Sequence, residues 1–451
     1  MPEERVGNAL QDFKPSAVTL WATLIIAFLG WMFDGMEMGL YSWAIPPALK
    51  ELFNTTDSKA IGPYIGVTVA LFLAGMSVGG VIFGRLGDRI GRVKTMIITI
   101  SVYAVFTGLS GLCRNFYELA ACRFLGALGL GGEWGLGVAL VMETWPNTSR
   151  PLLAGLLGGA ANVGFLIAAF VTTLLAKYGL SWRYAMIVGF APAVLTVFVM
   201  LFVKESERWV RSQKRGERSR MAELFSPALR RNSLIGVALS AVAVLGMWGV
   251  YQAWLQAWVD ALVGEGAELQ AARAAARAEV SVWMAIGSIG GAILGGLAAE
   301  WFGRRLSYAI FCVGGAASSW ALYLTCASYG PWLLFLAMLG GVFAASFFGW
   351  LPLYLPELFP TRIRATGEGL TFNAGRIISA GGVLVTGQLV QILRDYRWES
   401  QFAFINIKVT SHLANASDAY KYASSVMALI YVVGLILIWF TPETKGGDLP
   451  E

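Results

Sequence analysis

Long apolar runs, separated by short polar segments, fill the chain almost from end to end. A helix that crosses a membrane needs about 20 mostly apolar residues, and the sequence contains twelve runs of this kind. Their approximate bounds are 19–43, 63–84, 95–112, 117–142, 152–176, 183–203, 233–259, 281–300, 307–326, 332–355, 366–390 and 423–441. The pattern predicts an all-α membrane protein with twelve transmembrane helices.

Composition narrows the class of protein further. Of the 451 residues, 57% are hydrophobic and 14% are charged, whereas soluble chains carry about 25% charged residues. The 53 glycines and 17 tryptophans suit helices that pack closely in lipid, with aromatic side chains at its interfaces. These values exclude a water-soluble enzyme, a nucleic-acid-binding module and a disordered scaffold, and they make the lipid bilayer a partner.

The basic residues are distributed unevenly over the loops. With both ends of the chain in the cytoplasm, the inner loops and tails carry 21 Lys and Arg residues and the outer loops 11. Because positive charge accumulates on the cytoplasmic side of membrane proteins, we expect both termini to be cytoplasmic. The compact loops favour a bacterial inner membrane.

One polar motif occurs twice. The segment 84–94 reads G-R-L-G-D-R-I-G-R-V-K and follows the second apolar run. A degenerate copy at 296–305 follows the eighth run, and the acidic residues Asp88 and Glu300 are 212 positions apart.

A second pair of motifs has nearly the same spacing. Glu143 and Glu357 each follow an apolar run, each precede an arginine by seven residues, and are 214 positions apart. The two offsets indicate parallel halves, which are typical of transporters that bind substrate between the halves near the membrane midplane. The predicted organisation is a six-helix half at 1–203, a basic linker at 204–232 and a second six-helix half at 233–451.

The motif at 84–94 resembles the signature loop of the major facilitator superfamily. P-E-L-F-P-T-R-I-R at 356–364 and P-E-T-K-G at 442–446 resemble the sugar and metabolite:proton symporter branch of that family. The resemblance covers the whole chain, and it implies a secondary transporter that works by alternating access. One motif departs from the family pattern, because K-E-S-E-R at 204–208 lacks the flanking prolines.

The motif loops of this family resemble latches that close the cytoplasmic side. We expect Asp88 and Glu300 at the N-termini of facing helices, where the helix dipole favours a carboxylate, and the loop arginines paired with nearby glutamates. The alternative is that these charges only fix the topology. The predicted gating residues are Gly84, Asp88, Arg89, Gly91, Arg92, Glu143, Arg150, Glu205, Arg208, Glu300, Arg304, Glu357, Arg364 and Glu443.

Ionisable residues also lie inside predicted spans, where charge is costly and is usually functional. Asp34 and Glu37 share a face of the first span, and by depth either carboxylate reaches Arg123 in the fourth span. The resemblance favours Asp34, because Gly39 follows it and because Arg123 opens an R-x-x-G-x-x-G run, as in proton-coupled sugar symporters. It implies that Asp34 and Arg123 couple proton movement to transport. A permanent structural ion pair is the alternative.

Two further charges within the spans have no motif to assign them. Glu133 fits three interpretations equally well: a second protonatable site, a substrate contact, or a carboxylate paired with an inner-loop arginine. Arg376 lies near the midplane, and guanidinium groups bind carboxylates bidentately, so it is the candidate for binding a substrate carboxylate. Its alternative is a pair with Glu133 or Glu37 across the cavity.

Polar and aromatic residues on the spans that line the cavity in this fold complete the predicted substrate site. Aromatic residues at helical spacing are also typical of packing. The paired glutamines of hexose porters are absent from the seventh span, which favours an organic anion over a sugar. The predicted substrate-binding residues beside Arg376 are Asn373, Asn162, Gln252, Tyr251, Trp350 and Tyr354.

The sequence therefore predicts a monomeric, proton-coupled symporter of a small carboxylate. A neutral-sugar or polyol symporter is the alternative, and it requires Arg376 to be paired internally. A substrate-sensing receptor is disfavoured by the short tails. No nucleophile elbow, metal-ligand spacing or phosphate-binding loop is present, so no enzyme activity, cofactor or metal is expected. The long segment 391–422 has no predicted role.

Overall fold

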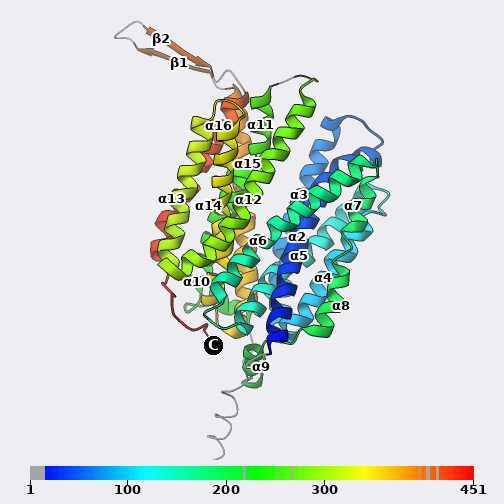
Figure 1. Ribbon diagram of the computed structural model, residues 1–451, viewed down its shortest axis with the longest axis vertical. Coiled ribbons are helices and arrows are strands. Elements are labelled where there is room, and N and C mark those ends of the chain that lie inside the picture. Colours follow the sequence, from blue (N-terminus) through cyan, green and yellow to red (C-terminus); the bar gives the residue numbers. More distant parts are fainter. Residues whose placement is uncertain are drawn as a thin grey trace, which may run out of the picture.

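The computed structural model describes residues 16–216, 220–252, 254–264, 266, 268–395, 397–402, 407–412 and 416–450. In this part of the chain, eleven helical stretches are long and apolar enough to cross a membrane. They stand side by side in one bundle (Figure 1). A further crossing is divided between two shorter helices, so the predicted twelve-helix membrane fold is confirmed.

The divided crossing is the sixth. Pro192 stands immediately before its second helix, and a proline both lacks a backbone N–H donor and disfavours a helical residue before it. The predicted span 183–203 is therefore interrupted near its middle. The helices of this half are α2 (Ala17–Leu52), α3 (Ser58–Ile90), α4 (Arg92–Ser110), α5 (Phe116–Thr144), α6 (Arg150–Lys177), α7 (Trp182–Val188) and α8 (Ala193–Phe202).

The second half contains another irregular crossing, the seventh. It consists of α10 (Arg230–Leu245), the π-helical segment η2 (Gly246–Gln252) and α11 (Leu255–Val263). The remaining elements are α12 (Gln270–Phe302), α13 (Arg304–Thr325), α14 (Pro331–Glu357), η3 (Thr361–Ile363), α15 (Arg364–Asp395), α16 (Ala416–Met427), α17 (Ile430–Leu437) and η4 (Ile438–Phe440).

The segment 391–422, to which the sequence assigned no role, contains regular structure. The helix α15 continues to Asp395, and the strands β1 (Arg397–Phe402) and β2 (Ile407–His412) form an antiparallel pair. In their register Arg397 is opposite His412. Figure 1 shows these strands projecting from one end of the bundle, which we call the hairpin end.

The opposite end of the bundle carries the repeated motif loops, and we call it the motif end. The linker helix α9 (Glu207–Lys214) and the C-terminal segment lie at this end (Figure 1). A second linker element, η1 (Met221–Phe225), is held to η3 by an ion pair between Glu223 and Arg362.

The two halves approach each other closely near the motif end. A Cβ atom on Gly84 of α3 would lie 2.5 Å from the carbonyl oxygen of Ala365 in α15. A Cβ atom on Gly158 of α6 would lie 2.3 Å from the carbonyl oxygen of Phe348 in α14. Small residues allow this kind of helix contact in membranes. Both glycines lie within about three turns of the motif end, so the bundle is closed there.

Candidate functional site

Asp88 of α3 reaches across the motif end to the first turn of α15. Its carboxylate accepts hydrogen bonds from the backbone N–H of Thr366 at 2.9 Å and from Thr366 Oγ1 at 2.5 Å. It also pairs with Arg92 Nη1 at 3.0 Å. Free N–H groups and the helix dipole favour a carboxylate at this position. Asp88 therefore lies at the N-terminus of a facing helix and links the two halves.

A single oxygen of Glu143 joins an arginine from each half. Glu143 Oε1 lies 3.0 Å from Arg92 Nη2 and 2.9 Å from Arg364 Nη1, and all three side chains are fully buried. Arg92 also donates to the carbonyl oxygen of Thr361 at 2.7 Å. The bonds of Glu143 to Arg364 and of Arg92 to Thr361 therefore join the two halves, whereas the bond between Arg92 and Glu143 lies within the first half.

Two glutamates cap the helices that follow the repeated motif. Glu205 accepts hydrogen bonds from the backbone N–H groups of the first three residues of α4, at 2.8, 3.0 and 3.2 Å. Glu443 accepts from the first two N–H groups of α13, at 2.9 and 3.0 Å. The residues before these helices are Gly91 and Gly303, with φ of 113° and 83°, values that favour glycine. Each half therefore has an equivalent cap.

The pKa of Glu443 makes its cap dependent on pH. Burial alone would raise this pKa, but hydrogen bonds from the N–H groups of Arg305, Arg304 and Lys445 lower it below the ordinary value of 4.5. A carboxylate with a lowered folded-state pKa stabilises the fold above its ordinary pKa, and the contribution fades as the pH falls through the folded-state value. We expect Glu443→Gln to lower the free energy of unfolding by about 0.5–2 kcal/mol near neutral pH, the size of a lost helix cap.

Thermal unfolding of the purified protein checks this expectation. The difference between the wild type and Glu443→Gln should shrink as the pH is lowered from neutral. Glu205→Gln is the matched comparison, because burial raises the pKa of Glu205. A raised folded-state pKa means that the stabilising contribution of Glu205 is full in acid and declines as the pH rises. The loss of stability in Glu205→Gln should therefore be smaller at neutral pH than in acid. Parallel pH dependence for the two variants would contradict the assignment.

The repeated motif at 296–305 makes different contacts from the motif at 84–94. Arg304 donates from Nε and Nη2 to the two carboxylate oxygens of Glu357, at 3.0 and 2.5 Å. The side chain of Glu300 is 51% exposed and lies 3.9 Å from Arg304, so its predicted place at a facing helix N-terminus is wrong. The first turn of α6 lacks two of the three donors that Asp88 has in α15. Pro151 stands where Ala365 donates its N–H, and Leu152 stands where Thr366 donates its hydroxyl.

The other predicted gating residues differ in their environment. Arg150 is buried at the start of α6, Arg208 is partly buried in the linker helix, and Arg89 is exposed at the end of α3. Their roles in gating stay predictions.

Arg123 in α5 pairs with Glu37 of α2, at 2.5 Å between Nη1 and Oε1. The same carboxylate oxygen accepts a hydrogen bond from Thr107 at 3.3 Å. The guanidinium lies 3.5 Å from the centre of the Tyr41 ring and 3.8 Å from that of Phe72. The pair is buried and enclosed by aromatic rings.

The expected pair of Asp34 with Arg123 is therefore replaced by Glu37 with Arg123 in this structure. The cause is depth along the first helix. Glu37 lies three residues, or about 4.5 Å, nearer the hairpin end than Asp34, and this brings it level with Arg123. Both carboxylates share a helix face, so depth along the axis decides the partner.

Asp34 and Glu133 form a second buried group of charges. The two carboxyl groups are neighbours, and none of their four oxygens has a hydrogen-bond partner of good geometry within the described chain. Glu133 lies against the backbone of α2, since a Cβ atom on Gly30 would be 2.0 Å from Glu133 Oε1. Gly30 is one turn before Asp34, so α2 and α5 hold two carboxyl groups together in the interior.

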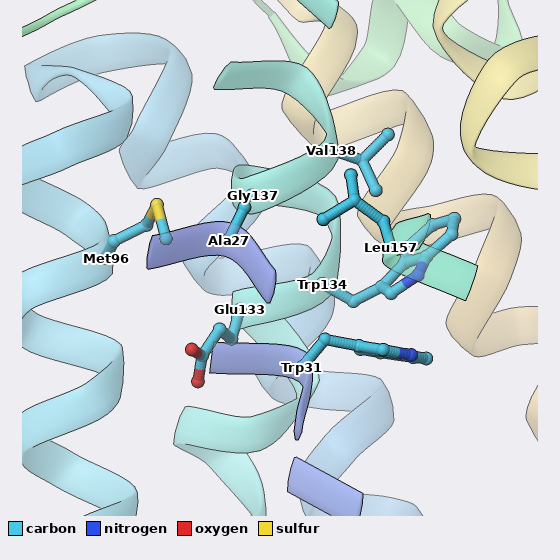
Figure 2. A pocket seen from close by; sticks show the side chains of 8 residues that line it. All are labelled: Ala27, Trp31, Met96, Glu133, Trp134, Gly137, Val138 and Leu157. Carbon is cyan, nitrogen blue, oxygen red and sulfur yellow. The ribbon is translucent and has the colours of Figure 1, made fainter. Parts of the chain in front are cut away.

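A small cavity lies beside Glu133. It has room for about one water molecule, and its lining includes Trp31 and Trp134. Figure 2 shows the Glu133 carboxyl pointing away from the two tryptophan rings. A water molecule here would have Glu133 as a polar neighbour.

Arg376 lies where the two halves meet. Its Nη1 donates to Asn373 Oδ1 at 3.2 Å, and its guanidinium lies 4.4 Å from the ring centre of Phe372 and 5.8 Å from that of Trp31. Phe372 stacks on Trp134 at 3.9 Å. No carboxylate of the described residues lies within 4.0 Å of Arg376. The alternative internal pairs of Arg376 with Glu133 or Glu37 are therefore absent here.

Three predicted substrate contacts are enclosed in the second half in this structure, and their role in binding stays a prediction. Tyr251, Trp350 and Tyr354 are fully buried. The Tyr251 hydroxyl is 2.7 Å from Ser319 Oγ, Trp350 donates to the carbonyl oxygen of Arg304 at 3.1 Å, and Tyr354 donates to that of Pro442 at 3.0 Å. Helical spacing places such residues on one face of a helix, but it does not say which neighbour that face meets.

The three predicted polar contacts with substrate, Asn373, Asn162 and Gln252, lie in different environments. Asn373 donates to the carbonyl oxygen of Gly131 at 3.1 Å and so ties α15 to α5. Asn162 and Gln252 are partly exposed, and their roles as substrate contacts stay predictions.

Sequence reasoning missed four residues of this region. Trp31, Trp134 and Phe372 form the aromatic wall beside Arg376, and two of them directly adjoin Glu133 and Asn373 in the sequence. Glu368 is fully buried, with both carboxyl oxygens unpartnered in the described chain. The sequence could have identified Glu368, because it is an acidic residue inside the predicted span 366–390.

These features define a membrane transporter. Two packed halves enclose buried charged groups, and ion pairs and hydrogen bonds join the halves at the motif end. Within the described ranges no group of His, Cys, Asp or Glu side chains is placed to hold a metal. A family model described as Major Facilitator Superfamily matches residues 20–383. The chain belongs to this superfamily, and it is a transporter and not an enzyme.

The relatives are metabolite transporters. The chain is 30% identical to a probable 4-methylmuconolactone transporter of Cupriavidus pinatubonensis, over 95% of this chain and 91% of the relative. It is 29% identical to a cis,cis-muconate transport protein of Acinetobacter baylyi, over 79% and 84%. Among solved structures, a proton:xylose symporter with bound 6-bromo-6-deoxy-D-glucose shares the fold, with a TM-score of 0.73, 19% identity, and coverage of 96% of this chain and 98% of that one.

Proposed function

We propose that this transporter is a proton-coupled symporter of a small organic anion that carries a carboxylate. The observation that carries the proposal is Arg376, a guanidinium between the halves that has no acidic partner within 4.0 Å in the described chain. A carboxylate substrate supplies that partner, in bidentate geometry. The relative named for muconate transport is consistent with this, because cis,cis-muconate is a dicarboxylate.

The aromatic wall supports a planar substrate. Trp31 and Trp134 come from the first half and Phe372 from the second. The three rings contact one another, and those of Trp31 and Phe372 lie beside the Arg376 guanidinium. Aromatic faces stack on conjugated groups as well as on guanidinium groups. A conjugated acid would therefore contact both halves at once.

We assign the transported proton to Asp34 and Glu133 together. Two adjacent carboxyl groups in a low-dielectric interior cannot both ionise, so the pair holds one proton. Arg376 is the cation that interacts electrostatically with Asp34. A substrate carboxylate that binds Arg376 competes with ionised Asp34 for the guanidinium. This favours uptake of a proton by Asp34, in addition to the one that the pair already holds. Glu37 and Arg123 form a structural pair in this mechanism.

We place the motif end in the cytoplasm, with both termini, in a cell membrane of the inner type. The excess of basic residues in the loops at this end supports that orientation. In this orientation the closed end of the bundle is the cytoplasmic one. Import driven by the inward proton gradient is part of the proposal.

Transport in proteoliposomes tests the proposal. Purified protein is supplied in turn with lactate, sialate, benzoate, cis,cis-muconate or xylose while the external pH is recorded. We expect a carboxylate to cause external alkalinisation, and Asp34→Asn to abolish it while exchange of labelled for unlabelled substrate continues. Glu118→Gln, an exposed acid near the hairpin end, is the control and should behave like the wild type.

Other outcomes have definite meanings. If only xylose drives alkalinisation, the protein is a sugar symporter and the anion proposal is wrong. If a carboxylate is transported without proton movement in the wild type, the proton coupling is wrong and the substrate class stands.

A further inference from the structure

We propose that Glu368 is a proton-binding site of the motif end, which holds a proton while this end is closed and releases it when this end opens. The carboxyl group lies in the first turns of α15, close to Asp88, Arg92, Glu143 and Arg364. It is distinct from Asp34 and Glu133 and needs no substrate.

Glu368 is enclosed by elements of both halves. Its residue is fully buried, and Gly135 of α5 lies directly against it, since a Cβ atom on that glycine would be 3.5 Å from Glu368 Cβ. Neither carboxyl oxygen has a hydrogen-bond partner in the described chain. The charged groups that face it are Arg364 on its own helix, Glu143 on α5, Arg92 on α4 and Asp88 on α3.

The two arginines in this cluster are already occupied. Arg92 donates to Glu143 and to the carbonyl oxygens of Gly87 and Thr361. Arg364 donates to Glu143 and to the carbonyl oxygens of Pro356 and Pro450. The two carboxylates, Asp88 and Glu143, and the two arginines of this cluster therefore sum to zero net charge without Glu368.

An ionised Glu368 would add an unpaired negative charge to this balanced cluster. An uncompensated buried charge costs several kcal/mol, and such a group takes up a proton instead. Another buried cation, Arg150, does not supply the missing partner. Its own acidic neighbours are Glu357 and Asp448, and Arg208 and Arg364 repel it.

Opening the motif end changes this balance. Separation of α3 from α15 breaks the close contact of Gly84 with Ala365 and the bonds of Asp88 to Thr366. Water then reaches Glu368, whose carboxyl O–H bond breaks to give a carboxylate and a proton in solution on the motif side. The closed state binds one more proton than the open state, so a higher pH favours opening. The equilibrium constant for opening should rise by at most about tenfold per pH unit.

Hydrogen–deuterium exchange of substrate-free protein in lipid nanodiscs tests the inference. We follow peptides that cover 84–92 and 361–369, correct for the intrinsic pH dependence of exchange, and compare the wild type with Glu368→Gln. The protection factors of these peptides in the wild type should fall as the pH rises, by at most about tenfold per pH unit. Glu368→Gln, a neutral replacement, should remain protected at every pH.

Infrared spectroscopy supplies a second readout. The wild type at neutral pH should show a band of a protonated carboxyl group that Glu368→Gln lacks. The matched control is Glu207→Gln, an acid at the same end whose side chain is 45% exposed, which should leave both the band and the pH dependence unchanged.

Several results would overturn the inference. One is an unchanged carboxyl band in Glu368→Gln, and another is a pH dependence of protection equal to that of the wild type. If Glu368→Gln and Glu368→Met both fail to fold while Glu207→Gln folds normally, the inference is also wrong, because neutral side chains should replace a protonated carboxyl. None of these readouts depends on the anion or proton coupling proposed above.

Discussion

Replacing Arg376 with alanine is expected to weaken binding of the carboxylate substrate about 10- to 150-fold. Hydrogen bonds to charged groups contribute about 1.5–3 kcal/mol, and each 1.4 kcal/mol is about a tenfold change in affinity. In this structure the guanidinium has one hydrogen bond within the protein to a side-chain oxygen, that of Asn373. No carboxylate of the described residues lies within 4.0 Å of Arg376, so its removal breaks no ion pair of the resting structure.

Equilibrium binding and initial uptake rates measure this effect. Arg376→Lys should bind with intermediate affinity, because it keeps the charge and loses the planar fork that fits a carboxylate. Thermal unfolding separates binding from folding, and we expect both variants to unfold within a few degrees of the wild type. Unchanged affinity in Arg376→Ala would show that Arg376 does not bind the substrate.

Replacing Arg123 with alanine is expected to reduce stability more than any other single change considered. Breaking a buried ion pair by removing one partner costs about 3–5 kcal/mol, because Glu37 would remain buried without its cation. Both side chains are almost fully buried, at 7% and 2% exposure. Thermal unfolding and the yield of monodisperse protein in detergent report this loss.

The double variant Arg123→Met with Glu37→Gln is the matched control. It removes both charges and keeps the volume of the site, so it should recover most of the stability. Its proton-coupled transport should also survive, because the proposed proton site is Asp34 with Glu133. If the double variant is stable but transports substrate without protons, Arg123 belongs to the coupling site, as the sequence first suggested.

The helices of this protein could be predicted because membrane insertion imposes a single strong constraint, which is a long apolar run. The exceptions come from local chemistry. Pro192 divides the sixth crossing, and the strands after Asp395 lie in a polar segment that hydropathy does not describe. Helix ends extend beyond the apolar runs because polar residues at the membrane surface continue a helix readily.

The latch residues could be predicted because the repeat identified them twice. What the repeat did not reveal was the asymmetry between the copies, which comes from two differences in the facing helix. Pro151 and Leu152 in α6 lack the N–H of Ala365 and the hydroxyl of Thr366, and Glu300 is exposed.

The centre of the protein was harder to predict, since it depends on depth and rotation of helices to within one turn. Glu37 and Asp34 differ by three residues, and only packing shows which of them is level with Arg123. The rotation of a helix about its axis is equally hard to predict from the sequence. Tyr251 was predicted to contact substrate, but its hydroxyl lies against Ser319 within the second half. Glu368 is different, because it lies inside the predicted span 366–390 and could have been listed among the charges within the spans.

The cap on α4 and the contact of Asp88 with α15 depend on segments of the chain that are synthesised at different times. Glu205 follows its partners in α4 by 111 to 113 residues, so the first half completes its own cap before the second half is made. Asp88 waits much longer, because Thr366 is 278 residues further along the chain. A ribosome that has released only the first half therefore leaves the carboxylate of Asp88 open to water. Closure of the motif end must then be one of the last events in the biogenesis of this transporter.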